Sequence, residues 1–138
     1  MHKKSPFLGS VIKLLVLLSV LIPASLLART QANISNIRTS VKANIQRIVF
    51  DITGEKDPAY YLKKEGQSLN ITLEALISPA QEQKLSRKIE NSKYISSVEF
   101  LTLEDEEETI ITLNLNKRVK EDVFSLPSPS RLVIDLKD

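Results

Sequence analysis

The sequence has no cysteine, no tryptophan and only one histidine among its 138 residues. Without cysteine the chain can form neither disulfide bonds nor thiolate metal sites. The histidine is His2, next to the N-terminus, so the rest of the chain has no Ser-His or Cys-His catalytic pair and no histidine ligand for zinc. Glycine is also scarce, with three residues, so most turns must be built from Asn, Asp, Ser and Pro.

The net charge of +2 conceals a charge difference between the N-terminus and the rest of the chain. Removing Lys3, Lys4 and Lys13 from this total leaves a charge of −1 for residues 29–138. Nonspecific binding to nucleic acid needs a surplus of Lys and Arg that displaces counterions. We therefore expect no nucleic-acid partner.

The N-terminal segment has the three-part order of a secretory signal peptide. A basic start is followed by an apolar run over residues 14–22, a break at Pro23 and small residues at Ala28 and Ala32. Cleavage after Ala32 is favoured, because cleavage after Ala28 would place the bulky Leu26 at a position that prefers a small residue. Residues 1–32 are therefore predicted to be a signal peptide, and the protein is predicted to be periplasmic or associated with the cell envelope. The alternative is an uncleaved anchor, through which alone the chain would contact the membrane, although the run is short for a bilayer span.

Two stretches with nearly the same sequence predict two strands. Arg47–Ile52 and Arg131–Leu136 both alternate apolar and other side chains with a period of two, which indicates one buried face and one wet or partly covered face. Further alternating runs occur around residues 34–39, 60–63, 69–75, 95–103 and 109–116, and a short apolar stretch lies at 123–126. Turn residues separate them, including Gly66 in a predicted hairpin. Six to eight short strands of this kind indicate a sandwich or a barrel.

One segment has helical rather than strand character. Residues 79–92 are mostly good helix formers, and Leu85 and Ile89 would share a helical face. Ser78 is the expected N-cap, with Pro79 at the first helical position. The predicted fold is therefore all-β, a small sandwich of two short sheets, with one short helix near residues 79–92 and a single domain over residues 33–138.

Two groups of charged residues are candidate sites. The acidic run 104–108 lacks the Gly and Asn or Asp spacing of a calcium loop, so we expect a solvated hairpin tip and no metal. Arg47 and Asp51 are about 13 Å apart along their strand, too far for contact. If the two similar strands pair antiparallel, Arg47 would face Asp135 and Arg131 would face Asp51. The favoured interpretation is a structural cross-strand contact, and the functional alternative is a polar patch that binds a peptide or a glycan.

The sequence contains no carboxylate pair, Gly-rich phosphate loop or nucleophile motif that would support catalysis, and it indicates no cofactor. Sugar stacking would have to depend on Tyr60, Tyr61 and Tyr94. We therefore expect a protein that is not an enzyme.

The segments Arg47–Gly54 and Pro129–Leu136, with a Tyr-containing strand between them, resemble the AMIN domain. This domain occurs at the N-terminus of bacterial N-acetylmuramoyl-L-alanine amidases and of type IV pilus secretins. The resemblance covers roughly residues 34–137. It implies a β-sandwich that binds peptidoglycan or positions an envelope enzyme, without the amidase zinc domain.

Three functional hypotheses follow. The first is an exported, non-catalytic envelope module that binds peptidoglycan or localises an envelope machine, with Arg47, Asp51, Arg131 and Asp135 as candidate ligand-binding residues. The second is an interaction subunit that docks to a secretin, a divisome protein or a separate amidase through a sheet edge. The third is a fragment of a longer amidase or secretin.

Overall fold

The computed structural model describes residues 31–54 and 57–138, which form one compact unit. Most of the predicted signal peptide lies outside these residues. No helix in the described part of the chain is long and apolar enough to span a membrane.

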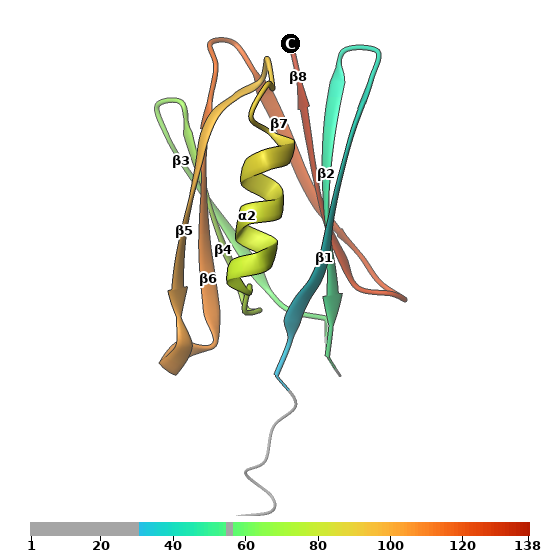
Figure 1. The fold of residues 1–138 in the computed structure, drawn as a ribbon, viewed down its shortest axis with the longest axis vertical. Coiled ribbons are helices and arrows are strands. Elements are labelled where there is room, and N and C mark those ends of the chain that lie inside the picture. Colours follow the sequence, from blue (N-terminus) through green and yellow to red (C-terminus); the bar gives the residue numbers. More distant parts are fainter. Residues whose placement is uncertain (1–30, 55–56) are drawn as a thin grey trace, which may run out of the picture. The chain divides into compact units, whose positions relative to one another are not determined.

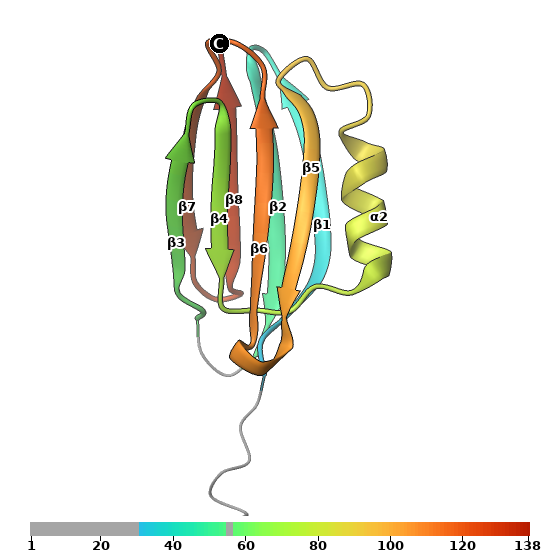
Figure 2. The ribbon, with the colours of Figure 1, turned by 90° about the vertical axis from the view of Figure 1, so that its left-hand side faces the viewer.

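Two four-stranded antiparallel sheets face each other in this unit (Figures 1 and 2). We call them sheet A and sheet B. Sheet A has the order β1-β2-β8-β7, with β1 at Asn33–Lys42, β2 at Ile45–Thr53, β7 at Lys120–Leu126 and β8 at Arg131–Lys137. Sheet B has the order β3-β4-β6-β5, with β3 at Tyr60–Glu65, β4 at Ser68–Leu73, β5 at Ile95–Leu103 and β6 at Glu108–Leu115. This arrangement confirms the predicted small β-sandwich.

The core lies between the two sheets and follows the alternation of the strands. Phe50 of β2 and Ile134 of β8 are fully buried, and so are Ile71 and Ile111 of the facing sheet. Burying such side chains is the main favourable term in folding. The six apolar residues predicted to share the inner face of the two similar strands are all buried: Ile48, Phe50, Ile52, Leu132, Ile134 and Leu136.

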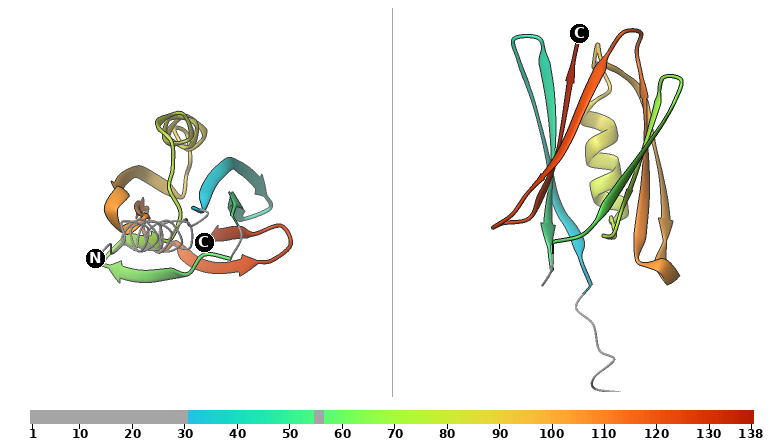
Figure 3. Two further views of the ribbon diagram at one scale, coloured as in Figure 1. Left: turned by 90° about the horizontal axis from the view of Figure 1, so that it is seen from below. Right: turned by 180° about the vertical axis from the view of Figure 1, so that it is seen from behind.

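The one α-helix of the described residues, α2 at Pro79–Lys88, packs against the edge strands β1 and β5 (Figures 2 and 3). Its start is as predicted, because the Ser78 hydroxyl accepts a hydrogen bond from the Gln81 N–H and Pro79 follows the cap. Leu85 and the capping residue Ile89 are buried on the predicted common face. The helix therefore covers the open side of the core between β1 and β5.

The helix is shorter than the predicted range 79–92. Beyond Lys88 the chain turns, and the Ser92 hydroxyl accepts hydrogen bonds from the N–H groups of Tyr94 and Ile95 at 3.0 and 3.1 Å. These bonds satisfy backbone donors outside the helix and direct the chain into β5.

Two turns behave as predicted, and one strand was predicted only in part. The acidic run joins β5 to β6 through a short 3-10 turn, η1 at Glu104–Glu106. Gly66 has a φ of +60° between β3 and β4. In contrast, the stretch predicted only as apolar residues 123–126 is the end of a full strand, β7, which begins at Lys120. Its sequence alternates poorly, and it is extended because β8 supplies backbone hydrogen-bond partners along its length.

Candidate functional site

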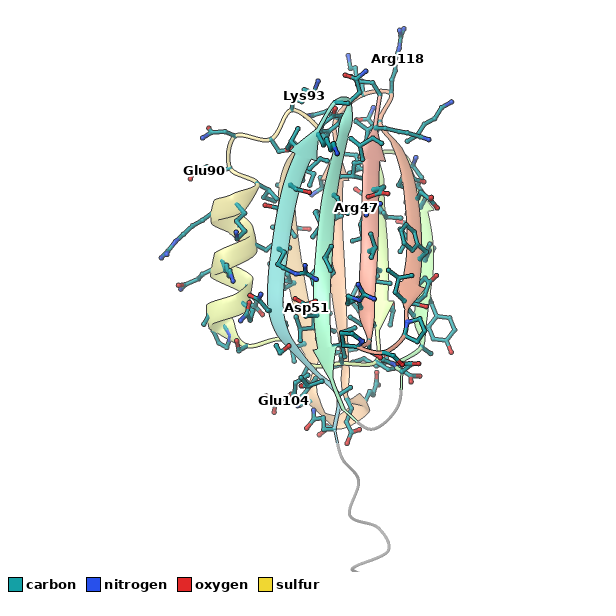
Figure 4. All side chains as sticks on the ribbon, turned by 90° about the vertical axis from the view of Figure 1, so that its right-hand side faces the viewer. Arg47, Asp51, Glu90, Lys93, Glu104 and Arg118 are labelled. Carbon is teal, nitrogen blue, oxygen red and sulfur yellow. The ribbon has the colours of Figure 1, made fainter. Side chains whose placement is uncertain are left out.

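The outer face of sheet A carries all four candidate ligand-binding residues. Strands β2 and β8 pair antiparallel, with Arg47 opposite Asp135 and Asp51 opposite Arg131. The side chains of these residues alternate with inward-facing apolar ones, so they lie on the side of the sheet away from the core. Figure 4 shows Arg47 and Asp51 on this face. Residues 88 positions apart in sequence, such as Arg47 and Asp135, are thereby brought into contact.

Arg47 and Asp135 form the predicted cross-strand ion pair. The guanidinium donates from Nε and Nη2 to the two carboxylate oxygens, each at 2.7 Å. This side-on geometry is the strongest form of the pair. The hydrogen bond from Arg47 lowers the pKa of Asp135 although partial burial opposes the shift, and the same bond raises the pKa of Arg47.

The second predicted pair is correct in register but does not form through the side chains. Asp51 faces Arg131 across the ladder, yet its oxygens accept from Nε and Nη2 of Arg38, on β1, at 2.8 and 2.7 Å. The hydrogen bond to Asp51 and its negative charge both raise the pKa of Arg38. Sequence reasoning missed Arg38 because its role depends on the register between β1 and β2.

The arginines surround an apolar patch in the middle of the face. Val49 of β2 and Val133 of β8 are directly opposite each other, and Phe124 of β7 is the next residue in the same row. The Arg47 guanidinium carbon lies 5.8 Å from the centre of the Phe124 ring, so this side chain extends across β8. Val133 is consequently only 2% exposed although it lies on the outer side of the sheet.

A hollow of about 260 Å³ opens beside this patch. Its floor includes Val49 and Val133, and Leu126 contributes another apolar wall. Three arginines also line it, Arg38, Arg47 and Arg131. An apolar floor with a few convergent polar groups is the usual composition of a small ligand site.

The rest of the outer face of sheet A carries three lysines and one exposed aspartate, Asp122, which is opposite Asp135 in the β7–β8 ladder. Lys42, Lys120 and Lys137 belong to one row across the sheet, in which Lys137 pairs with both Ile45 and Lys120. Within the described residues none of these three lysines forms a salt bridge. The face is therefore positively charged in a domain predicted to be slightly acidic, which favours an anionic partner.

The outer face of sheet B has a different chemistry. Its central strands present neutral hydrogen-bonded side chains, including Thr112 to Asn70 and Ser68 to Asn114, at 2.7 and 2.6 Å. Of the three tyrosines considered for sugar stacking, Tyr94 is buried, Tyr60 is half-buried and Tyr61 is 61% exposed. Tyr61 is therefore the one tyrosine of the chain with an open ring face.

Among residues 31–54 and 57–138, no group of three acidic side chains is arranged to hold a metal ion, and this includes the acidic run at η1. No protein-family model matches the sequence, and no curated protein matches it closely enough to count as a relative. The AMIN resemblance therefore stays a prediction from the two similar strands.

Proposed function

We propose that this protein is an exported, non-catalytic module of the bacterial cell envelope that binds peptidoglycan and can thereby localise an envelope machine. The observation that carries the proposal is the pairing of the two strands that resemble the AMIN domain. Their Arg and Asp side chains form one outward face with a hollow on it. The signal-like N-terminus supports export, and the basic face suits a wall polymer whose peptide stems carry carboxylates.

Co-sedimentation with purified sacculi tests the proposal. The double variant Arg47→Gln/Asp135→Asn removes an ion pair from the outer face of sheet A and should lower the bound fraction several-fold. The matched control is Lys63→Gln/Glu65→Gln, which removes an exposed ion pair of 2.9 Å from β3 in sheet B. The control should sediment like the unaltered protein. If the unaltered protein stays in the supernatant, peptidoglycan binding is refuted.

A protein-interaction subunit is the second candidate, and an uncovered sheet edge favours it. Strand β3 is an edge strand of sheet B, and its Tyr61 and Leu62 are 61% and 45% exposed. An edge of this kind can accept a strand from a partner. The same strand carries three charged residues, Lys63, Lys64 and Glu65. Charged side chains on an edge strand discourage nonspecific strand pairing, so this edge favours a selective partner.

Site-specific photo-crosslinking in cells separates this candidate from wall binding. A crosslinker at Leu62 should yield one product of defined mass, whereas one at Glu90, at the far end of the helix segment, should yield none. Purified protein that sediments with sacculi without any partner would contradict an obligatory docking role.

A further inference from the structure

The three guanidinium groups at the hollow on sheet A differ in what they already bind. Arg38 and Arg47 each hold a carboxylate side-on, so their charges are compensated by Asp51 and Asp135. Arg131 holds no carboxylate in the described part of the chain, and its Nε donates to the backbone oxygen of Pro129 at 3.1 Å.

Arg131 therefore has donors available for a ligand. A guanidinium has five N–H donors in a planar fork, and the described residues engage only the Nε–H of Arg131. Both terminal nitrogens remain without a protein partner in residues 31–54 and 57–138. Asp51, the carboxylate opposite Arg131 in the ladder, is already held by Arg38.

The charge around the hollow matches a single negative charge. The pairs Arg38–Asp51 and Arg47–Asp135 are each neutral, which leaves the charge of Arg131. A planar guanidinium binds a carboxylate through two parallel hydrogen bonds. A dianion such as phosphate would retain one uncompensated charge at this position.

The volume and the lining residues of the hollow indicate which chemical group is attached to the bound carboxylate. Its volume of about 260 Å³ falls just below the range of about 300–1,000 Å³ for complete small-molecule pockets, so it fits the end of a chain rather than a whole ligand. Val49 and Leu126 supply apolar surface for a small side chain. The two side-on ion pairs hold the rim arginines in place before the ligand arrives, which reduces the entropy lost on binding.

We propose that this hollow binds the free terminal carboxylate of a peptide that ends in a small apolar residue, with Arg131 as the counter-charge and Val49 and Leu126 as the apolar contact surface. The inference rests on the proposed function, because the peptide stems of peptidoglycan are the source of such ends in the envelope. It assigns recognition to the peptide rather than to the sugar chain.

An NMR titration of the protein at low ionic strength tests this inference, because low salt leaves the charge of Arg131 unscreened. The probes are N-acetyl-D-alanyl-D-alanine, its C-terminal amide, inorganic phosphate and a chitin tetrasaccharide. The acid should shift backbone amide signals of β2 and β8, and the amide should bind about tenfold more weakly or worse. Phosphate and the tetrasaccharide should leave these signals unchanged at the same concentration.

Three variants locate the site. Arg131→Gln should weaken binding of the acid about tenfold or more, whereas Arg87→Gln on the helix should have no effect. Leu126 is opposite Arg131 in the β7–β8 ladder and is 36% exposed. A substitution at Leu126 therefore tests the site without changing a buried core residue. Leu126→Glu places a carboxylate beside Arg131 and should exclude the peptide while the protein stays folded.

Several results would overturn the inference. Equal binding of acid and amide, unchanged binding by Arg131→Gln, or equally strong binding of phosphate would each do so. Sacculi that still sediment the protein while the acid fails to bind would refute the peptide site and leave the proposed function standing. If the unaltered protein does not sediment with sacculi, the proposed function itself is refuted.

Discussion

Asp51 lies directly opposite Arg131 in the β2–β8 ladder, yet both of its carboxylate oxygens accept hydrogen bonds from Arg38. Arg38 is opposite Val49 on the other side of β2, so it is a diagonal neighbour of Asp51 and within reach of a long side chain. The choice of Arg38 as the partner leaves the guanidinium of Arg131 available at the rim of the hollow. Four charged residues that look like two equivalent pairs in the sequence are therefore not equivalent in the fold.

The first prediction concerns acid stability. The hydrogen bond from Arg47 lowers the pKa of Asp135 below its ordinary value of 3.8 in the folded state. The ionised carboxylate is thus favoured by folding, so its contribution is complete above the unfolded pKa and disappears as the pH falls through the lower folded pKa. The difference in unfolding free energy between the protein and Asp135→Asn should shrink over that acidic window, measured by urea unfolding at a series of pH values.

An Arg47→Gln background provides the control for this experiment. Without the guanidinium, the pH dependence of the effect of Asp135→Asn should shrink or change sign across the same window, because partial burial, which raises the pKa of Asp135, remains. A pH dependence of the same sign and undiminished size in this background would contradict the assigned cause.

The second prediction concerns the core. Phe50 is fully buried between the sheets, so Phe50→Ala should lower the free energy of unfolding by about 3–5 kcal/mol. Phe124 is the matched control, because it lies on the outer face of the same sheet and is only partly buried. Phe124→Ala should cost clearly less in the same denaturant titration, and equal costs would place the core on the wrong side of sheet A.

The third prediction compares two glycines with positive φ. Gly66, at φ +60°, has no atom within 4 Å of where a Cβ would lie, so Gly66→Ala should cost only the left-handed backbone strain of about 1–2 kcal/mol. At Gly54, with φ +150°, a Cβ would lie 3.0 Å from the Cα of Ala32. Gly54→Ala should therefore destabilise more than Gly66→Ala in thermal unfolding. The reverse order would show that Ala32 moves aside easily.

The fourth prediction concerns the start of the folded unit. The carbonyl of Ala32 accepts a hydrogen bond from the Leu76 N–H at 3.0 Å. A chain that starts at Arg29 keeps this bond, and one that starts at Asn33 loses it, at a cost of about 0.5–1.5 kcal/mol. Urea unfolding of the two shortened proteins should therefore give a lower midpoint for the chain that starts at Asn33. Equal midpoints would mean that removal of Ala32 leaves the fold unaffected.

Local patterns in the sequence were enough to predict much of this fold. Ser78 and Pro79 mark the start of the helix because an N-cap acts on backbone groups only three residues away. The hairpin at Gly66 depends on the backbone freedom of one residue. Strand β7 was only partly predicted, because its pattern is weak and its extended form depends on pairing with β8.

The candidate site was predicted less completely than the fold. Arg47 and Asp135 were identified because two similar strands repeat the same residues, and antiparallel pairing then brings them together. Arg38 could not be found this way, because its contact with Asp51 depends on the register of the β1–β2 hairpin. Arg47 covers Val133 by extending toward the ring of Phe124. Phe124 lies in β7, the strand that the alternation of apolar residues predicted only in part.

The sequence by itself determined which side chains of the clearly alternating strands face the core, because a period of two places alternate residues on opposite sides of any sheet. It likewise determined where the helix begins and where the chain can turn. The tertiary structure alone decided that β2 lies between β1 and β8, since strand order arises from burying both sheets against each other. That order places Arg38 diagonally beside Asp51, whose oxygens accept its hydrogen bonds, and leaves Arg131 without a carboxylate in the described residues, because diagonal contacts exist only between strands that lie side by side.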